Sequence, residues 1–308
     1  MMDNERHLWA LAEGMANAYR HSALLFAVLK IGLFDVLREE ALSCEELGKI
    51  LNVSSRRLRA FLDALAYYDV LVREGDRYAV AQDWLPLTDP EREDNLQARF
   101  AHNIRNSQSW FFAAEVLLSD RPAFTLSPTT EPNDDARTAF HRSLGTRSLT
   151  LMRLILNSLP IPDGARILDL GGGFGDICRP ILERDPKANA LLFEAPPTAA
   201  LAKKHHERLG LSDRFSVIAG DFLTDELPSD LDLVIVSNIL HIYSESTCLA
   251  LLDRLRLSLR PKGLLLIHEV TIDPDREGPL GGLHFAINMA INTAEGDAHP
   301  PRNMSPDG

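Results

Sequence analysis

The chain has 308 residues, 45% of them hydrophobic and 25% charged, which suits about two soluble globular domains. Its formal net charge of -12 argues against a nucleic-acid partner, because neutralising phosphates requires clustered Lys and Arg. No stretch reaches the roughly 18 apolar residues of a membrane span, and no secretory signal is visible, so we expect a cytoplasmic protein without a membrane partner. Cys44, Cys178 and Cys248 lie far apart without a CxxC pair, which indicates neither a disulfide framework nor a zinc site.

Residues 1–85 predict helices followed by a small hairpin. Apolar residues recur at helical spacing over 24–31. Ser43 and Glu46 form a capping-box pattern that opens a short helix, and a second amphipathic helix follows it. Segments 71–73 and 78–80 then face each other across a Gly-Asp turn. Helix, turn, helix and hairpin together predict a winged-helix domain.

A winged helix leaves open a DNA-binding regulator as one alternative function. Arg56, Arg57 and Arg59 lie on the helix that would enter a major groove. The acidic total charge and the catalytic pattern of the second half favour a dimerisation module instead.

Residues 86–160 predict a helical connector that contributes to a substrate pocket. We expect one long helix over 94–119, a proline-containing loop over 121–133 and a further helix over 134–158. The aromatic run from Trp110 to Phe112 could wall a pocket, although core packing is the favoured interpretation.

Residues 161–308 predict an α/β domain with a doubly wound, mostly parallel sheet. Segments of strand character alternate with segments of helical spacing, which is typical of parallel sheets with crossover helices. The predicted strands are Arg166–Leu170, Ala190–Glu194, Phe215–Ala219, Leu231–Ser237 and Leu264–Val270. Ligands of such sheets bind beyond the carboxyl ends of the strands, so functional residues are expected there.

A glycine-rich loop follows the first of these strands. Gly171, Gly173 and Gly175 do not fit the G-x-G-x-x-G spacing of a dinucleotide site. Asp169 beside the loop disfavours a pyrophosphate and favours a cationic ligand by Coulomb attraction. A nucleoside that carries an ammonium and a sulfonium group would suit this loop better than a dinucleotide.

Two further acids end the next two strands. Glu194 lies about 20 residues beyond the loop, where an acid accepts hydrogen bonds from ribose hydroxyls. Asp221 can accept a hydrogen bond from an exocyclic amine, and Phe222 can pack against an adenine. Each acid alone could be an ordinary strand-end cap, but three acids at successive strand ends after a glycine loop predict a cofactor site.

These motifs together resemble those of the caffeate/acetylserotonin-type O-methyltransferases. The resemblance covers residues 10–292 and is carried by segments 165–175, 193–196, 220–222, 240–243 and 260–263, with 31–37 similar to the family's dimerisation domain. It implies a class I methyltransferase fold, S-adenosylmethionine as methyl donor, a homodimer through the N-terminal domain, and a small aromatic or natural-product hydroxyl as acceptor. It also implies cofactor contacts from the positions Gly171, Glu194, Asp221, Phe222 and Ser237. The glycine loop itself adds Asp169 and Gly173 to the expected cofactor-binding residues.

Histidine chemistry supplies the expected catalytic base. His241 follows the fourth strand and matches the family's base, since an imidazole titrates near neutral pH. Glu269 ends the fifth predicted strand and matches the acid that orients this histidine. His205 and His206 are adjacent on a helix and are expected to point apart, so we predict no metal site.

Three departures from the family pattern leave a second function open. Ile242-Tyr243 stands where the family has Asp-Trp, and Ala298 replaces an expected acid. The family's last helix and closing strand pair have no counterpart, so we expect a C-terminally truncated domain with an uncovered sheet edge. A relative that binds S-adenosylmethionine without methylating, either cyclase-like or inactive, is therefore the alternative.

Overall fold

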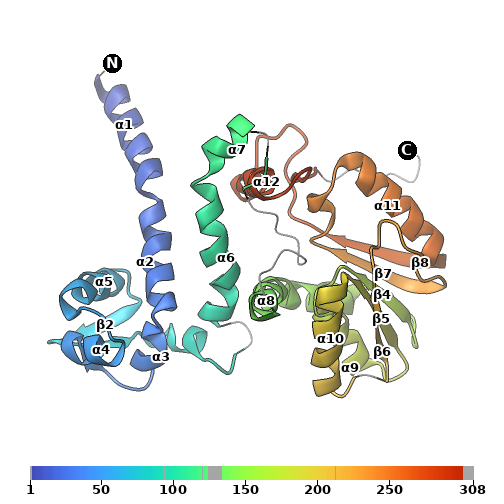
Figure 1. Ribbon diagram of the computed structural model, residues 1–308, viewed down its shortest axis with the longest axis horizontal. Coiled ribbons are helices and arrows are strands. Elements are labelled where there is room, and N and C mark those ends of the chain that lie inside the picture. Colours follow the sequence, from blue (N-terminus) through green and yellow to red (C-terminus); the bar gives the residue numbers. More distant parts are fainter. Residues whose placement is uncertain (1, 93–94, 120, 124–133, 212, 301–308) are drawn as a thin grey trace. The chain divides into compact units, whose positions relative to one another are not determined.

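The chain divides into two compact units, Met1–Ile104 and Arg105–Gly308, each with its own hydrophobic core (Figure 1). The computed structural model describes residues 2–92, 95–119, 121–123, 134–211 and 213–300. Over these residues, no helix combines the length and the apolar character that crossing a membrane would need.

The first unit has the predicted order of helices followed by a hairpin, and its strands form a three-stranded sheet. Its elements are α1 (Met2–Asn17), α2 (Tyr19–Lys30), α3 (Leu33–Leu37), β1 (Leu42–Ser43), α4 (Cys44–Ile50), α5 (Ser55–Tyr67), β2 (Leu71–Glu74), β3 (Arg77–Val80) and the 3-10 turn η1 (Leu85–Thr88). The Ser43 side chain accepts from the Glu46 amide while the Glu46 carboxylate accepts from the Ser43 amide, which confirms the capping box. The hairpin pairs Leu71 with Val80, as the turn signal predicted.

The connector helices differ in one respect from the prediction. The expected single helix over 94–119 is two helices, α6 (Leu96–Trp110) and α7 (Ala113–Ser119), whereas α8 (Asp134–Ser158) has the predicted bounds. The Ser109 hydroxyl donates to the carbonyl of Asn106, and such side-chain bonds compete with regular helix geometry next to the break. The side chains of Phe111 and Phe112 are exposed by 73% and 50%, so core packing is the wrong interpretation for them. Most of the proline-containing loop lies outside the described residues.

The second unit is built on a five-stranded parallel sheet. Its strands are β4 (Arg166–Leu170), β5 (Asn189–Glu194), β6 (Phe215–Ala219), β7 (Leu231–Ser237) and β8 (Leu259–His268), in the order β6-β5-β4-β7-β8. Residues of α8, α9 (Arg179–Arg184) and α10 (Pro196–Arg208) pack on one face, and those of α11 (Glu245–Ser258) pack on the other. The remaining elements are the 3-10 turns η3 (Asp176–Cys178) and η4 (Leu240–Ile242) and the helix α12 (Leu280–Asn292).

The strand order creates a switch point beside β4. The chain passes from β4 outward through β5 to β6 and then returns to β7 on the opposite side of β4. Ligands of open parallel sheets bind in the crevice at such a reversal, outside the carboxyl ends of the strands. The glycine loop after β4 and the η4 turn after β7 both lie at this position.

The fifth strand begins earlier and ends earlier than predicted. Residues 260–263, Arg-Pro-Lys-Gly, have a turn composition, yet they belong to β8 and form an irregularity opposite Leu231 and Leu233. Within the described part of the chain β8 is an edge strand, where a proline without an N–H is tolerated. Glu269 therefore follows the strand and does not end it.

Candidate active site

The glycine loop is held by two hydrogen bonds from its amides to β5, one to a main-chain carbonyl and one to a side-chain carboxylate. Gly171 donates its N–H to the carbonyl of Phe193 at 2.8 Å, and Gly173 donates to Glu194 Oε2 at 2.9 Å. Gly171, Gly173 and Gly175 all have positive φ angles, of 63°, 63° and 75°. A side chain at these positions would strain the backbone, which explains the glycine at each.

Asp169 is the most unusual group of the site. Its carboxylate is fully buried, and neither oxygen has a hydrogen-bond partner among the residues that the structure describes. Burial raises the pKa of Asp169 to about 7, and the charges of Glu194 and Asp176 add to this effect. A buried, unpaired carboxylate fits a cationic ligand group, which would supply the missing partner.

Glu194 and Asp221 lie at the ends of β5 and β6. Glu194 accepts from the amides of Gly173 and Ala195, and burial raises its pKa to about 7 although both hydrogen bonds act in the opposite direction. Asp221 is exposed and accepts from the Leu223 amide at 2.9 Å. Both carboxylates keep lone pairs for further donors, as ribose hydroxyls and an adenine amine would require.

Phe222 and Ser237 make contacts that the sequence did not specify. The Phe222 ring is buried and meets the rings of Phe193 and Tyr243 edge to face. Ser237 Oγ lies 2.9 Å from Nδ1 of His268, so this hydroxyl already has a protein partner. Its predicted contact to a cofactor stays a prediction.

An arginine of α11, missed by the sequence reasoning, supports the loop after β6. The Arg254 guanidinium donates to the carbonyl of Phe222 at 2.6 Å and also to the carbonyls of Leu223 and Asp225. Three carbonyls on one guanidinium fix the main chain on which Asp221 and Phe222 stand. We interpret Arg254 as a positioning residue.

His241 and Glu269 form a closely hydrogen-bonded pair. His241 Nδ1 lies 2.6 Å from Glu269 Oε2, and both side chains are about nine-tenths buried. Glu269 Oε1 accepts from the amides of Ile239 and Leu240, each at 2.7 Å. These three bonds fix the carboxylate, and the carboxylate assigns the proton of the neutral ring to Nδ1. Nε2 then carries a lone pair.

This pair adjoins the glycine loop. A Cβ built on Gly171 would meet the side chain of Ile239, which stands two residues before His241 in the chain. The structure thus brings together the loop after β4 and the turn after β7, which the sequence could only place at the same edge of the sheet. Phe285 of α12 packs edge-on against the imidazole, with ring centroids 4.8 Å apart.

A cluster of amides extends from this helix. Asn288 Oδ1 accepts from Asn106 Nδ2 at 2.5 Å and from Trp110 Nε1 at 3.1 Å, and Asn292 Nδ2 donates to Asn106 Oδ1 at 3.0 Å. Asn288 is three residues beyond Phe285, which places both on one side of α12. The sequence reasoning missed this cluster, although two asparagines on an apolar helix were an available signal.

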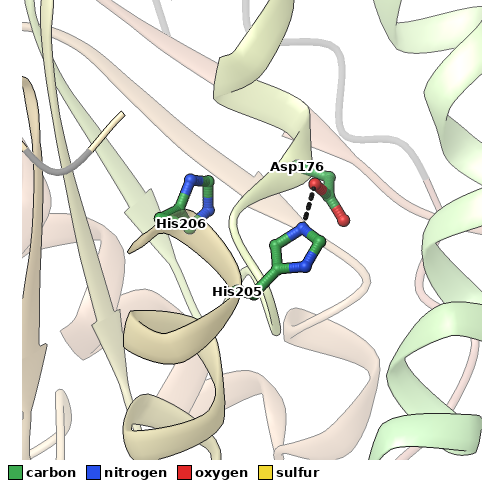
Figure 2. A group of neighbouring side chains, drawn as sticks. All are labelled: Asp176, His205 and His206. Carbon is green, nitrogen blue, oxygen red and sulfur yellow. Dashed lines mark hydrogen bonds and ion pairs between the residues drawn. The ribbon is translucent and has the colours of Figure 1, made fainter. Parts of the chain in front are cut away.

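The expectation that His205 and His206 point apart is wrong. Their ring centroids are 5.2 Å apart. One ring nitrogen of each histidine and one carboxylate oxygen of Asp176, atoms that could bind a metal ion, lie within 4.8 Å of one another (Figure 2). Asp176 Oδ1 accepts a hydrogen bond from His205 Nε2 at 2.9 Å.

A parallel sheet with a glycine loop, three acids at strand ends and an acid-supported histidine defines an α/β enzyme that binds a nucleoside. Residues 100–305 match the O-methyltransferase domain family, and residues 14–82 match the O-methyltransferase dimerisation domain. The chain therefore belongs to this O-methyltransferase family.

Curated relatives and solved structures agree with this assignment. The chain is 25% identical to human acetylserotonin O-methyltransferase over 320 residues, which cover 98% of this chain and 91% of that one. It is 26% identical to a 3-hydroxy-5-methyl-1-naphthoate 3-O-methyltransferase of Streptomyces sahachiroi over 292 residues, covering 92% and 83%. The crystal structure of human N-acetylserotonin methyltransferase in complex with SAM has the same fold, with a TM-score of 0.83 at 24% identity, covering 96% of this chain and 88% of that one.

Proposed function

We propose that this protein transfers a methyl group from S-adenosylmethionine to a hydroxyl of a small aromatic or natural-product substrate, with His241 as the general base. The observation that carries the proposal is the His241–Glu269 pair beside the glycine loop. The family assignment supports the reaction class, and relatives named for naphthoate and mitomycin substrates support the substrate class.

The cofactor would be held by the loop and by the strand-end acids. The buried Asp169 carboxylate lacks a partner and suits the ammonium group of the cofactor, whereas Glu194 and Asp221 retain acceptor capacity for its ribose and adenine. S-Adenosylmethionine supplies a methyl group already activated on a sulfonium. This chain therefore needs to bind, orient and deprotonate the acceptor.

His241 would remove the proton of the acceptor hydroxyl. A phenol with a pKa near 10 is a weak nucleophile at neutral pH, and a positioned base contributes about 10²–10⁴-fold to the rate. Glu269 holds Nδ1–H, so Nε2 is the atom that accepts the proton, and the adjacent carboxylate stabilises the imidazolium that forms. The neighbouring amides of α12 could donate to or accept from a second polar group of the substrate.

Labelled S-adenosylmethionine and a panel of small phenols test this proposal. We expect His241→Ala to lower kcat by about 10²–10⁴-fold while S-adenosylhomocysteine binds with unchanged affinity. Asp253→Asn, on an exposed side chain of α11, is the matched control and should keep full turnover. Unchanged turnover in His241→Ala would exclude this residue as the base. Tight cofactor binding without product from any acceptor would favour the non-methylating alternative.

We also propose that the protein is a homodimer through its first unit. The dimerisation-domain match lies in this unit, and α1 exposes the large apolar side chains of Leu8, Trp9, Leu11 and Met15. Such a row is typical of an interface. Light scattering should give twice the chain mass, and replacing Trp9 and Met15 with Glu should give the monomer.

A further inference from the structure

Phe174, in the glycine loop, contacts histidines from two helices. Its ring centroid is 5.5 Å from that of His141 of α8 and 5.4 Å from that of His205 of α10, which is stacked on it at 26°. Its carbonyl accepts a hydrogen bond from His206 Nε2 at 2.6 Å. The side chain of this loop residue therefore packs against two imidazoles, and its main chain is hydrogen-bonded to a third.

The same surroundings occupy the space that two of the loop glycines leave open. A Cβ on Gly173 would lie 2.6 Å from His141 Nδ1, and one on Gly175 would lie 2.4 Å from the ring of Phe215, with His206 Nε2 behind it at 3.4 Å. The Glu194 carboxylate, on β5, accepts a hydrogen bond from the N–H of Gly173. His206, on α10, donates one to the carbonyl of the following residue, Phe174. One hydrogen bond from each element thus fixes two consecutive residues of the loop.

His206 is itself rigidly held. It is 2% exposed and stacks on Phe215 of β6 with ring centroids 3.5 Å apart and planes 14° apart. Burial lowers its pKa, so the ring is neutral near pH 7 and its single proton is the one on Nε2. A buried, stacked donor facing a loop carbonyl restricts the position of that carbonyl.

The spacing of Asp176, His205 and His206 would also suit a divalent ion, but their present partners favour a hydrogen-bonded support (Figure 2). His206 Nε2 already donates to the Phe174 carbonyl. Asp176 Oδ1 is shared between His205 at 2.9 Å and the Arg179 guanidinium at 3.9 Å, and a neighbouring cation opposes metal binding.

We infer that His206 is a positioning residue for cofactor binding, which fixes the glycine loop through the Phe174 carbonyl while His141 and His205 pack against the Phe174 ring. The inference rests on the proposed binding of S-adenosylmethionine by this loop. It concerns affinity and leaves the chemical step to other residues. Loss of the His206 donor should therefore raise the KM for the cofactor and leave kcat at saturation unchanged.

Two substitutions at this position separate the hydrogen bond from the packing. His206→Phe keeps the stacking on Phe215 and removes the donor, and His206→Gln restores an N–H near Nε2. We expect the Kd of S-adenosylhomocysteine, measured by calorimetry, to rise about 5–10-fold in the Phe variant, the equivalent of one hydrogen bond. The Gln variant should stay within about 2-fold of the native value, because the bond to the carbonyl is retained.

The controls distinguish this inference from instability and from the proposed function. Leu182→Ala, on α9, destabilises the same core but leaves the His206–Phe174 hydrogen bond in place, so its Kd should match that of the native chain. A native-like Kd in His206→Phe, or equal losses in both His206 variants, would overturn the positioning role. A chelator that weakens binding to the native chain would replace it with a metal site. Failure of the native chain to bind S-adenosylhomocysteine would instead refute the proposed function.

Discussion

Asp169→Asn tests the electrostatic account of the site most directly. The folded chain raises the pKa of Asp169 from 3.8 to about 7, so it holds this proton more tightly than the unfolded chain does. Folding is therefore penalised increasingly as the pH rises from about 4 to about 7, and the penalty is constant above that. This penalty on the free energy of folding is about 4 kcal/mol at pH 8 and about 2 kcal/mol at pH 5.

The asparagine removes this penalty but buries an amide, at a pH-independent cost of about 1–3 kcal/mol. We thus expect the difference in unfolding free energy, variant minus native chain, to increase by about 2–3 kcal/mol when the pH is raised from 5 to 8. Urea unfolding of the cofactor-free protein at both pH values measures this gain. Asp253→Asn, on an exposed side chain, should show none. An equal stability difference at pH 5 and pH 8 would refute the reasoning.

The same carboxylate should make cofactor binding depend on pH. Because a cationic ligand binds best to the ionised form, affinity for S-adenosylhomocysteine should fall by up to about 10-fold for each pH unit below 7. Asp169→Asn should bind more weakly and with a shallower dependence, which Glu194, whose pKa burial also raises to about 7, would supply. Calorimetry between pH 5.5 and 8 decides the matter, and a parallel pH profile in both proteins would assign the dependence to another group.

Three further substitutions probe the surroundings of the site. Glu269→Gln should lower kcat by about 10²-fold or more, because an amide oxygen facing two backbone N–H groups leaves His241 without its carboxylate, and single-turnover kinetics would show it. Gly173→Ala should weaken S-adenosylhomocysteine binding, since the methyl group would meet His141 at a positive φ, and calorimetry measures the loss. Arg254→Met should raise the KM for the cofactor at unchanged kcat, because three carbonyls lose their donor, and initial-rate kinetics would detect this.

Local patterns predicted most of the fold. The capping box at Ser43, the hairpin register and the alternation of strands and helices are all encoded within about ten residues of the chain. The bounds of β8 were wrong because Pro261 and Gly263 indicate a turn in the interior of a sheet and are tolerated only at its edge. Whether a strand is an edge strand depends on the whole topology.

The positions of the candidate site residues were predictable and their contacts were not. The sequence placed the acids and His241 at one edge of the sheet, since parallel strands bring their carboxyl ends together, and the structure has them there. The hydrogen bonds between His206 and Phe174 and between Asn106 and Asn288 join residues that are 32 and 182 positions apart, so no local sequence pattern indicates them. The missing partner of Asp169 could not be predicted either, because burial is a property of the assembled sheet.

The neutral imidazole of His206 supports the glycine loop without adding a positive charge beside the acids Asp169 and Glu194. In the proposed function the cofactor meets the carboxylates of Asp169 and Glu194, so a Lys or Arg in place of His206 would neutralise part of their field and compete with a cationic cofactor. Burial keeps His206 uncharged while its Nε2–H still holds the Phe174 carbonyl. His206→Lys should therefore weaken cofactor binding more than His206→Phe, because it adds a competing charge to the loss of the hydrogen bond, and calorimetry of the two variants at pH 8 would reveal the order. A tighter complex in His206→Lys would show that main-chain positioning outweighs the acidic field.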